Sequence, residues 1–119
     1  MIRVHTIDIT TAGVAGSATG TGRTPIPVNG RIGAIKIDFT SQASTADTTI
    51  TDEFGQTFLS LTNVNTDGWW YPHPDIHDPT GSVLNKHTVP FVTSGYITAS
   101  VAQSNAGTVA ITILVCEGG

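Results

Sequence analysis

Charged side chains are scarce in this chain. Of its 119 residues, five are Lys or Arg and nine are Asp or Glu, so that 14, or 12%, carry a formal charge, against about a quarter in an ordinary soluble domain. Thr, Ser, Asn, Gln, Gly and exposed apolar atoms must therefore form most of the surface. Protein interfaces are depleted in charged residues, so the composition favours assembly. An equally good explanation is that Thr and Ser occupy the outer faces of strands, where Thr is favoured.

The chain also has few basic residues and no long apolar run, and these two features indicate whether nucleic acid or a membrane is a partner. The five Lys and Arg are scattered and the net charge is −4, so no basic stripe is available for phosphate backbones and nucleic acid is not expected as a partner. No apolar run approaches the roughly 20 residues of a membrane span, and we expect no membrane partner. The N-terminus has no apolar signal-peptide core, so we expect synthesis in the cytoplasm without export.

The sequence contains a single cysteine and none of the common catalytic motifs. Cys116 is the only cysteine, and its place at the end of an alternating apolar run predicts a buried, inert thiol. G-x-S-x-G, P-loop and H-E-x-x-H patterns do not occur. The adjacent Asp52 and Glu53 would point to opposite faces of a strand, which favours a solvated hairpin end over an acid–base pair. We therefore expect no enzymatic activity, no catalytic residue and no cofactor.

A helical period is missing as well. No segment repeats apolar residues every 3.6 positions over the length of a helix, whereas short alternating segments recur between Gly, Asn, Asp and Pro turns. This pattern predicts an all-β fold, an antiparallel β-sandwich that is jelly-roll-like and has about eight short strands. The length predicts one domain over residues 1–119.

The first strand is expected over residues 2–10, with an irregularity. Its apolar positions change from even to odd numbers near His5 and Thr6. Since alternate residues of a strand point to opposite faces, this change of parity predicts a β-bulge there.

The central part of the chain predicts a half-buried strand and a hairpin. Asn29-Gly30 is typical of a tight turn, so we expect a strand to begin directly after it. Residues 31–40 alternate most clearly between apolar and polar side chains. Residues 48–54 and 56–64 predict a hairpin that turns at Glu53-Phe54-Gly55.

The last third predicts an edge strand followed by a second hairpin. Residues 89–92 contain Pro90, which cannot donate to a β-ladder and so favours an edge position. Residues 96–102 and 108–116 both alternate. The intervening turn over residues 104–107 predicts that these two strands pair with each other.

A run of small residues over residues 11–24 contains four glycines, which resist helix and weaken a strand. It could be a flexible arm, or a strand whose face touches another backbone closely. Residues 1–24 are accordingly expected to form either an N-terminal strand or an arm that contacts a neighbouring subunit.

Large aromatic side chains and prolines are concentrated in residues 67–79, which contain both tryptophans and three of the six prolines. The prolines predict an extended segment without a complete hydrogen-bond ladder. Its aromatic side chains can close the end of a core or form a contact surface, and adjacent tryptophans on an extended chain should point to opposite sides. The candidate interaction surface consists of Trp69, Trp70, Tyr71 and His73. The same aromatic residues would also suit a sugar-stacking platform, so a carbohydrate-binding module is the alternative function.

The same segment contains a possible metal site. His73, Asp75 and His77 stand two residues apart, so an extended chain would place them on one side, and imidazole and carboxylate groups bind several divalent metals. A fourth ligand such as His87 would be needed. The alternative is that these side chains cap turns and hydrogen-bond to the backbone of the loop.

Three stretches together resemble the small all-β virion proteins of tailed bacteriophages, above all capsid decoration (cement) proteins. They are residues 48–61 (TTITDEFGQTFLSL), the run Trp69-Trp70-Tyr71-Pro72 and the expected closing hairpin from Tyr96 to Val115. The resemblance implies a β-sandwich or jelly-roll subunit of the virion, often a homotrimer, that binds the major capsid protein and stabilises the shell without catalytic residues. It is equally compatible with another tail or head-completion structural protein.

Overall fold

The computed structural model describes residues 1–84 and 89–117, and in this part of the chain every regular element is a β-strand. Within the same residues there is no helix with the length and apolar character to cross a membrane. The strands are β1 (Ile2–Thr11), β2 (Ala18–Arg23), β3 (Val28–Thr40), β4 (Asp47–Thr51), β5 (Thr57–Leu61), β6 (Gly68–Trp70), β7 (Ile76–His77), β8 (Val83–Leu84), β9 (Val92–Gly95), β10 (Thr98–Ser104) and β11 (Gly107–Cys116).

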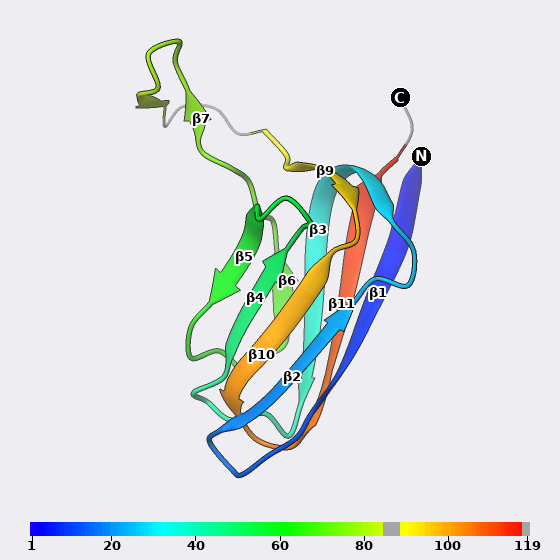
Figure 1. Ribbon diagram of the computed structural model, residues 1–119, viewed down its shortest axis with the longest axis vertical. Helices are drawn as coiled ribbons and strands as arrows, with labels where there is room; N and C mark the ends of the chain where they lie inside the picture. Colours follow the sequence, from blue (N-terminus) through cyan, green and yellow to red (C-terminus); the bar gives the residue numbers. More distant parts are fainter. Residues whose placement is uncertain (85–88, 118–119) are drawn as a thin grey trace.

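Nine of the described strands form two antiparallel sheets that pack as a sandwich, and β7 and β8 form a separate two-stranded sheet (Figure 1). One sheet has the order β1-β11-β3-β6, with β9 also paired to β3, and the other has the order β2-β10-β4-β5. The all-β sandwich that the sequence predicts is therefore confirmed. The jelly-roll connectivity stays a prediction, and the described residues form more strands than the eight expected because several have only two to four residues.

The core lies between the sheets and is built mainly from isoleucine and valine, whose branched side chains fit a pleated surface. β3 and β11 supply its centre, because Ile35 and Ile37 pair with Ile113 and Ile111 and all four are fully buried. The other buried apolar residues of the cluster are Ile7, Ile9, Val28, Ile32, Ala46, Ile50, Phe58, Phe91, Ile97, Ala99, Val101, Val109 and Val115. The predicted half-buried strand over residues 31–40 is thus confirmed.

The predicted tight turn at Asn29-Gly30 is wrong, because both residues lie inside β3. Asn29 pairs with Ser94 and Gly30 with Thr93 in β9. A side chain at residue 30 would clash with the carbonyl oxygen of Cys116. Glycine is therefore needed here for the close approach of two strands, which the sequence pair does not distinguish from a turn.

The predicted bulge in the first strand is also wrong. β1 pairs with β11 in one unbroken register from Ile2 to Thr11, and His5 is buried with the later odd-numbered residues. The apolar residues change from even to odd positions because Ile2 and Val4 point to the outside of the sheet, where their side chains are 68% and 58% exposed.

The two predicted hairpins have different outcomes. β4 and β5 form the first one, with the turn at residues 52–56, where the Asp52 carboxylate accepts hydrogen bonds from the N–H groups of Phe54 and Gln56. The closing hairpin is wrong, because β10 pairs with β2 and β4 while β11 pairs with β1 and β3. Residues 105–106 carry the chain from one sheet to the other, so the apolar faces of β10 and β11 pack across the core.

The edge strand that the sequence predicts over residues 89–92 begins later in the chain than expected. β9 begins at Val92, after the proline, and pairs only with the first residues of β3. Phe91 is still fixed by backbone pairing, because its carbonyl oxygen accepts a hydrogen bond from the N–H of Ile32. Its ring packs edge-on against Phe58.

The second half of the glycine-rich run forms a strand of the sandwich, β2, and residues 13–17 form the turn before it. β2 pairs with β10 and crosses close over β1. A side chain at Gly20 would lie 2.7 Å from the carbonyl oxygen of Thr10, and one at Gly22 would lie 3.1 Å from that of Asp8. The glycines thus permit the two sheets to meet along this side. Contact of residues 1–24 with a neighbouring subunit stays a prediction.

Candidate interaction surfaces

The two adjacent tryptophans lie on opposite faces of the five-stranded sheet. Trp70 pairs with Ile35, whose side chain is fully buried, and it packs half-buried against the core. Trp69 pairs with Lys36 and is 47% exposed on the outside. The expected division into one inward and one outward tryptophan is confirmed. Trp70 therefore does not share an exposed surface with its neighbours, because its ring closes the edge of the core.

The chain leaves the sandwich directly after Trp70. Residues 71–75 have no regular pairing, and β7 and β8 then pair only with each other in a small two-stranded sheet. Figure 1 shows this segment projecting away from the two large sheets. Residues 71–84 are called the projecting segment below. Four of its larger side chains are exposed: Tyr71, His73, Val83 and Leu84.

The tip of the projecting segment is a well-bonded turn. The Asp78 carboxylate accepts hydrogen bonds from the Thr80 hydroxyl at 2.7 Å and from the N–H groups of Thr80 and Ser82 at 2.9 and 3.0 Å. These bonds, that of the Thr80 hydroxyl foremost, lower the pKa of Asp78 below its ordinary value. Turn capping by an acidic side chain is thus present in this segment.

The three predicted metal ligands are not gathered around one point in the described part of the chain. His73, Asp75 and His77 are all exposed, but no group of three or more His, Cys, Asp or Glu among the described residues is placed to hold a metal ion. His73 Nδ1 instead lies 3.4 Å from the carbonyl oxygen of Pro74. A shared side of an extended chain is not enough, because ligands must also converge on one point. His87 lies outside the described residues.

A shallow pocket of about 320 Å³ adjoins the base of the projecting segment. Its lining residues are Ile32, Gly33, Tyr71, Pro72, His73, Val89 and Pro90. Tyr71 is the only aromatic residue among them. The predicted sugar platform of three aromatic rings is therefore not assembled, because Trp70 is turned inward and Trp69 lies on the sheet.

The outward side of the five-stranded sheet, which carries the exposed apolar side chains of Ile2, Val4, Trp69 and Val92, is called the outer sheet face. The antiparallel registers arrange it in rows: Ile2, Cys116, Arg31 and Val92; then Val4, Leu114 and Ala34; then Thr6, Thr112, Lys36 and Trp69; then Asp8, Ala110 and Asp38. Cys116 is exposed here, so the expected buried thiol is wrong. Its neighbour Val115 takes the inward position, and alternate residues point to opposite faces.

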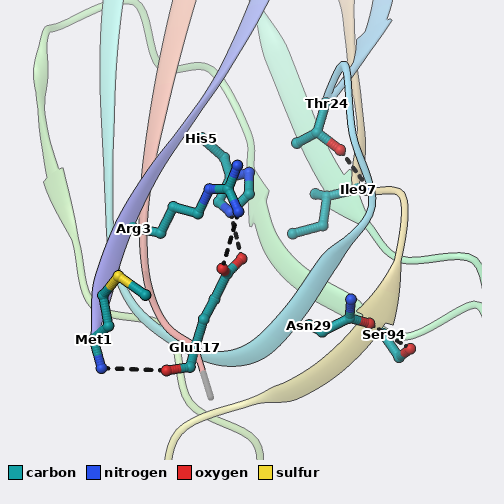
Figure 2. A network of polar contacts seen from close by, with 8 residues as sticks. All are labelled: Met1, Arg3, His5, Thr24, Asn29, Ser94, Ile97 and Glu117. Carbon is teal, nitrogen blue, oxygen red and sulfur yellow. Dashed lines mark hydrogen bonds and ion pairs between the residues drawn. The ribbon is translucent and has the colours of Figure 1, made fainter.

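A polar cluster joins the two ends of the chain (Figure 2). His5 Nε2 lies 2.7 Å from Glu117 Oε1, and the Arg3 guanidinium lies 3.6 Å from Glu117 Oε2. The backbones of Met1 and Glu117 also bond to each other. The hydrogen bond from His5, and then the charges of His5 and Arg3, lower the pKa of Glu117. Sequence reasoning missed this cluster, although Arg3 and His5 share one parity, because the pairing of the first strand with the last was not predicted.

Comparisons with models of protein families, with curated proteins and with solved structures found no match.

Proposed function

We propose that this protein is a structural, non-enzymatic component of a virion, which binds the outside of a capsid as a decoration protein and stabilises the shell. Its partner in this proposal is the major capsid protein. The observation that carries the proposal is the projecting segment, which the sandwich does not need for its own core.

The anchoring of this segment supports a clamping role. Trp70 is packed against the core at its base, and the Asp78 turn holds its tip. Exposed side chains lie between these two points: Tyr71 is 68%, Val83 48% and Leu84 42% exposed. A rigid sandwich that holds out a short hairpin with exposed apolar residues is suited to reach across a seam between two capsid subunits.

The scarcity of charge supports the same proposal. Few charged groups need to be desolvated when such a surface is buried, and a repeated lattice multiplies weak single contacts through high effective concentration. A decoration protein can therefore use a small hairpin contact that would be too weak in a single complex.

The proposal is tested by cosedimentation of the purified protein with capsids of the virus that encodes it, prepared without the protein. We compare the unchanged chain with a variant in which residues 76–84 are replaced by a Gly-Ser linker of equal length. A matched control replaces the exposed loop residues 13–17, which lie outside the projecting segment.

We expect the unchanged chain and the loop control to sediment with capsids, and the variant at residues 76–84 to lose at least tenfold in affinity while its circular dichroism is unchanged. Equal binding by all three proteins would contradict the clamping role. If the chain ignores capsids but binds soluble glycans, and Tyr71→Ala abolishes that binding, the carbohydrate-binding alternative replaces this proposal. Binding to isolated tails would identify a tail protein instead.

A further inference from the structure

The outer sheet face is apolar at its centre and along one end. Ile2 and Val92 are 68% and 66% exposed and lie at opposite ends of the same row. The next row contains the exposed Val4, the half-buried Leu114 and the buried Ala34, and no charged residue belongs to it. Ile2, Val4 and Leu114 are neighbours in these two rows and form an apolar patch, and apolar patches on small proteins can mark an interface.

The size of this face is suited to a second sheet. The face is four strands wide, at about 4.8 Å per strand, and about nine residues long, at about 3.3 Å per residue. These dimensions give an area of about 600 Å². Two such faces in contact would bury about 1,200 Å², which is at the lower limit of specific interfaces. Flat sheet faces pack on one another about 10 Å apart, as the two sheets inside a sandwich do.

We propose that the outer sheet face binds a second copy of this chain, face to face, about a twofold axis that runs parallel to the strands. This symmetry places β1 of each copy over β6 and β9 of the other, and β11 over β3. The inference is independent of the proposed function, which uses the projecting segment.

The registers make the face complementary to itself in this orientation. Ile2 meets Val92 of the second copy, and the half-buried Leu114 lies over the position of the buried Ala34 of the second copy. Thr6 meets Trp69 of the second copy, so that the exposed indole is covered. Each of these contacts occurs twice, as a twofold interface requires.

The charged residues of β3 do not oppose this orientation. Arg31 and Asp38 lie over Cys116 and Ala110 of the second copy, and Lys36 lies over Thr112, so none of these three charges faces a like charge. An axis across the strands, centred between the second and third rows, would instead place Arg31 on Asp38 of the second copy. The cross-linking test below distinguishes the two axes.

The first test is the oligomeric state of the isolated protein, measured by sedimentation equilibrium over a concentration series. We expect a dimer with a dissociation constant in the micromolar range, since the buried area is small. Val4→Asp should raise that constant at least tenfold. The control is Val14→Asp, because Val14 is 78% exposed in the turn between β1 and β2 and is not part of the face.

The second test fixes the orientation. In a Cys116→Ser background, Ile2→Cys combined with Val92→Cys should give a covalent dimer with a short bifunctional maleimide reagent, whereas Thr21→Cys, on the outer side of the other sheet, should not. A monomer at all concentrations, a trimer, or equal effects of Val4→Asp and Val14→Asp would overturn the proposal. A dimer that Ile2→Cys with Val92→Cys does not cross-link would overturn the axis.

Discussion

Trp69 and Trp70 are neighbours in the chain but belong to different parts of the molecule, because β6 directs Trp70 towards Ile35 in the core and Trp69 towards Lys36 outside. One dipeptide therefore fixes the base of the projecting segment and supplies part of the outer sheet face.

The tryptophans should respond differently to truncation. Trp70→Ala removes a ring that packs against the core, and we expect a loss of about 3 kcal/mol in the free energy of unfolding, the lower end for large aromatic truncations because Trp70 is only half-buried. Trp69→Ala should cost less than about 1 kcal/mol in the monomer. Urea denaturation of both variants measures the difference, and equal losses would contradict the assignment of faces.

Alanine at Gly20 should destabilise the sandwich through a backbone clash. The added methyl group would lie 2.7 Å from both the Thr10 carbonyl oxygen and the Ile9 side chain. Overpacking of this kind costs about 1–3 kcal/mol. Ser17→Ala, in the exposed turn before β2, is the control and should be close to neutral in the same urea titration. A neutral Gly20→Ala would show that β2 does not cross β1 so closely.

Stability should depend on pH through Glu117. Its pKa in the folded protein is lowered from the ordinary value of 4.5, so the carboxylate contributes stability that is present above pH 4.5 and is lost as the pH falls through the folded value. In Glu117→Gln this contribution disappears. We expect the midpoint of thermal unfolding of the variant to lie below that of the unchanged chain at pH 7 and to approach it at pH 3. A constant difference at both pH values would contradict the role of the carboxylate.

The buried hydroxyl of Ser104 should be important for the opposite end of the sandwich. It donates to Gln42 Oε1 and accepts from the N–H of Ala43, while Gln42 Nε2 bonds to Thr11. Ser104→Ala leaves two buried polar groups without this partner, and we expect a cost of about 1–3 kcal/mol. Thr45→Ala, which removes an exposed hydroxyl bonded to Gln103, is a milder comparison in the same denaturation experiment.

Short sequence patterns correctly predicted the structural features that are determined by residues close together in the chain. The alternation around Ile35 and Ile37, the turn at Asp52 and the split of Trp69 from Trp70 each follow from a period of two or from turn chemistry. Each of these features is determined within about ten residues. The all-β class follows from the same repeated signals.

Pairing between distant strands could not be predicted in this way. The β10–β11 segment reads as a hairpin because two alternating strands flank a turn, but each strand finds its partners in a different sheet. Gly30 reads as a turn residue because its close contact, the Cys116 carbonyl, is 86 positions away. The His5 and Glu117 cluster depends on the same long-range pairing of β1 with β11.

The spatial arrangement of the three predicted metal ligands could not be predicted from the sequence for a related reason. A spacing of two residues places His73, Asp75 and His77 on a common side of an extended chain, but it does not curve the chain around one point. Likewise, Cys116 is exposed because it follows the inward-pointing Val115 and alternate residues of β11 point to opposite faces. The sequence does not reveal this, because both residues at the end of the strand are apolar.

The central proposal is that the protein decorates the capsid of a virus that encodes it, and cryo-electron microscopy of that virus tests the proposal most directly. Particles that contain the protein are compared with particles from a virus in which its gene is deleted. We predict difference density on the outer surface of the capsid, with the sandwich above the shell and the projecting segment in contact with two neighbouring capsid subunits. Difference density on the tail or inside the shell, or no difference at all, would contradict the account.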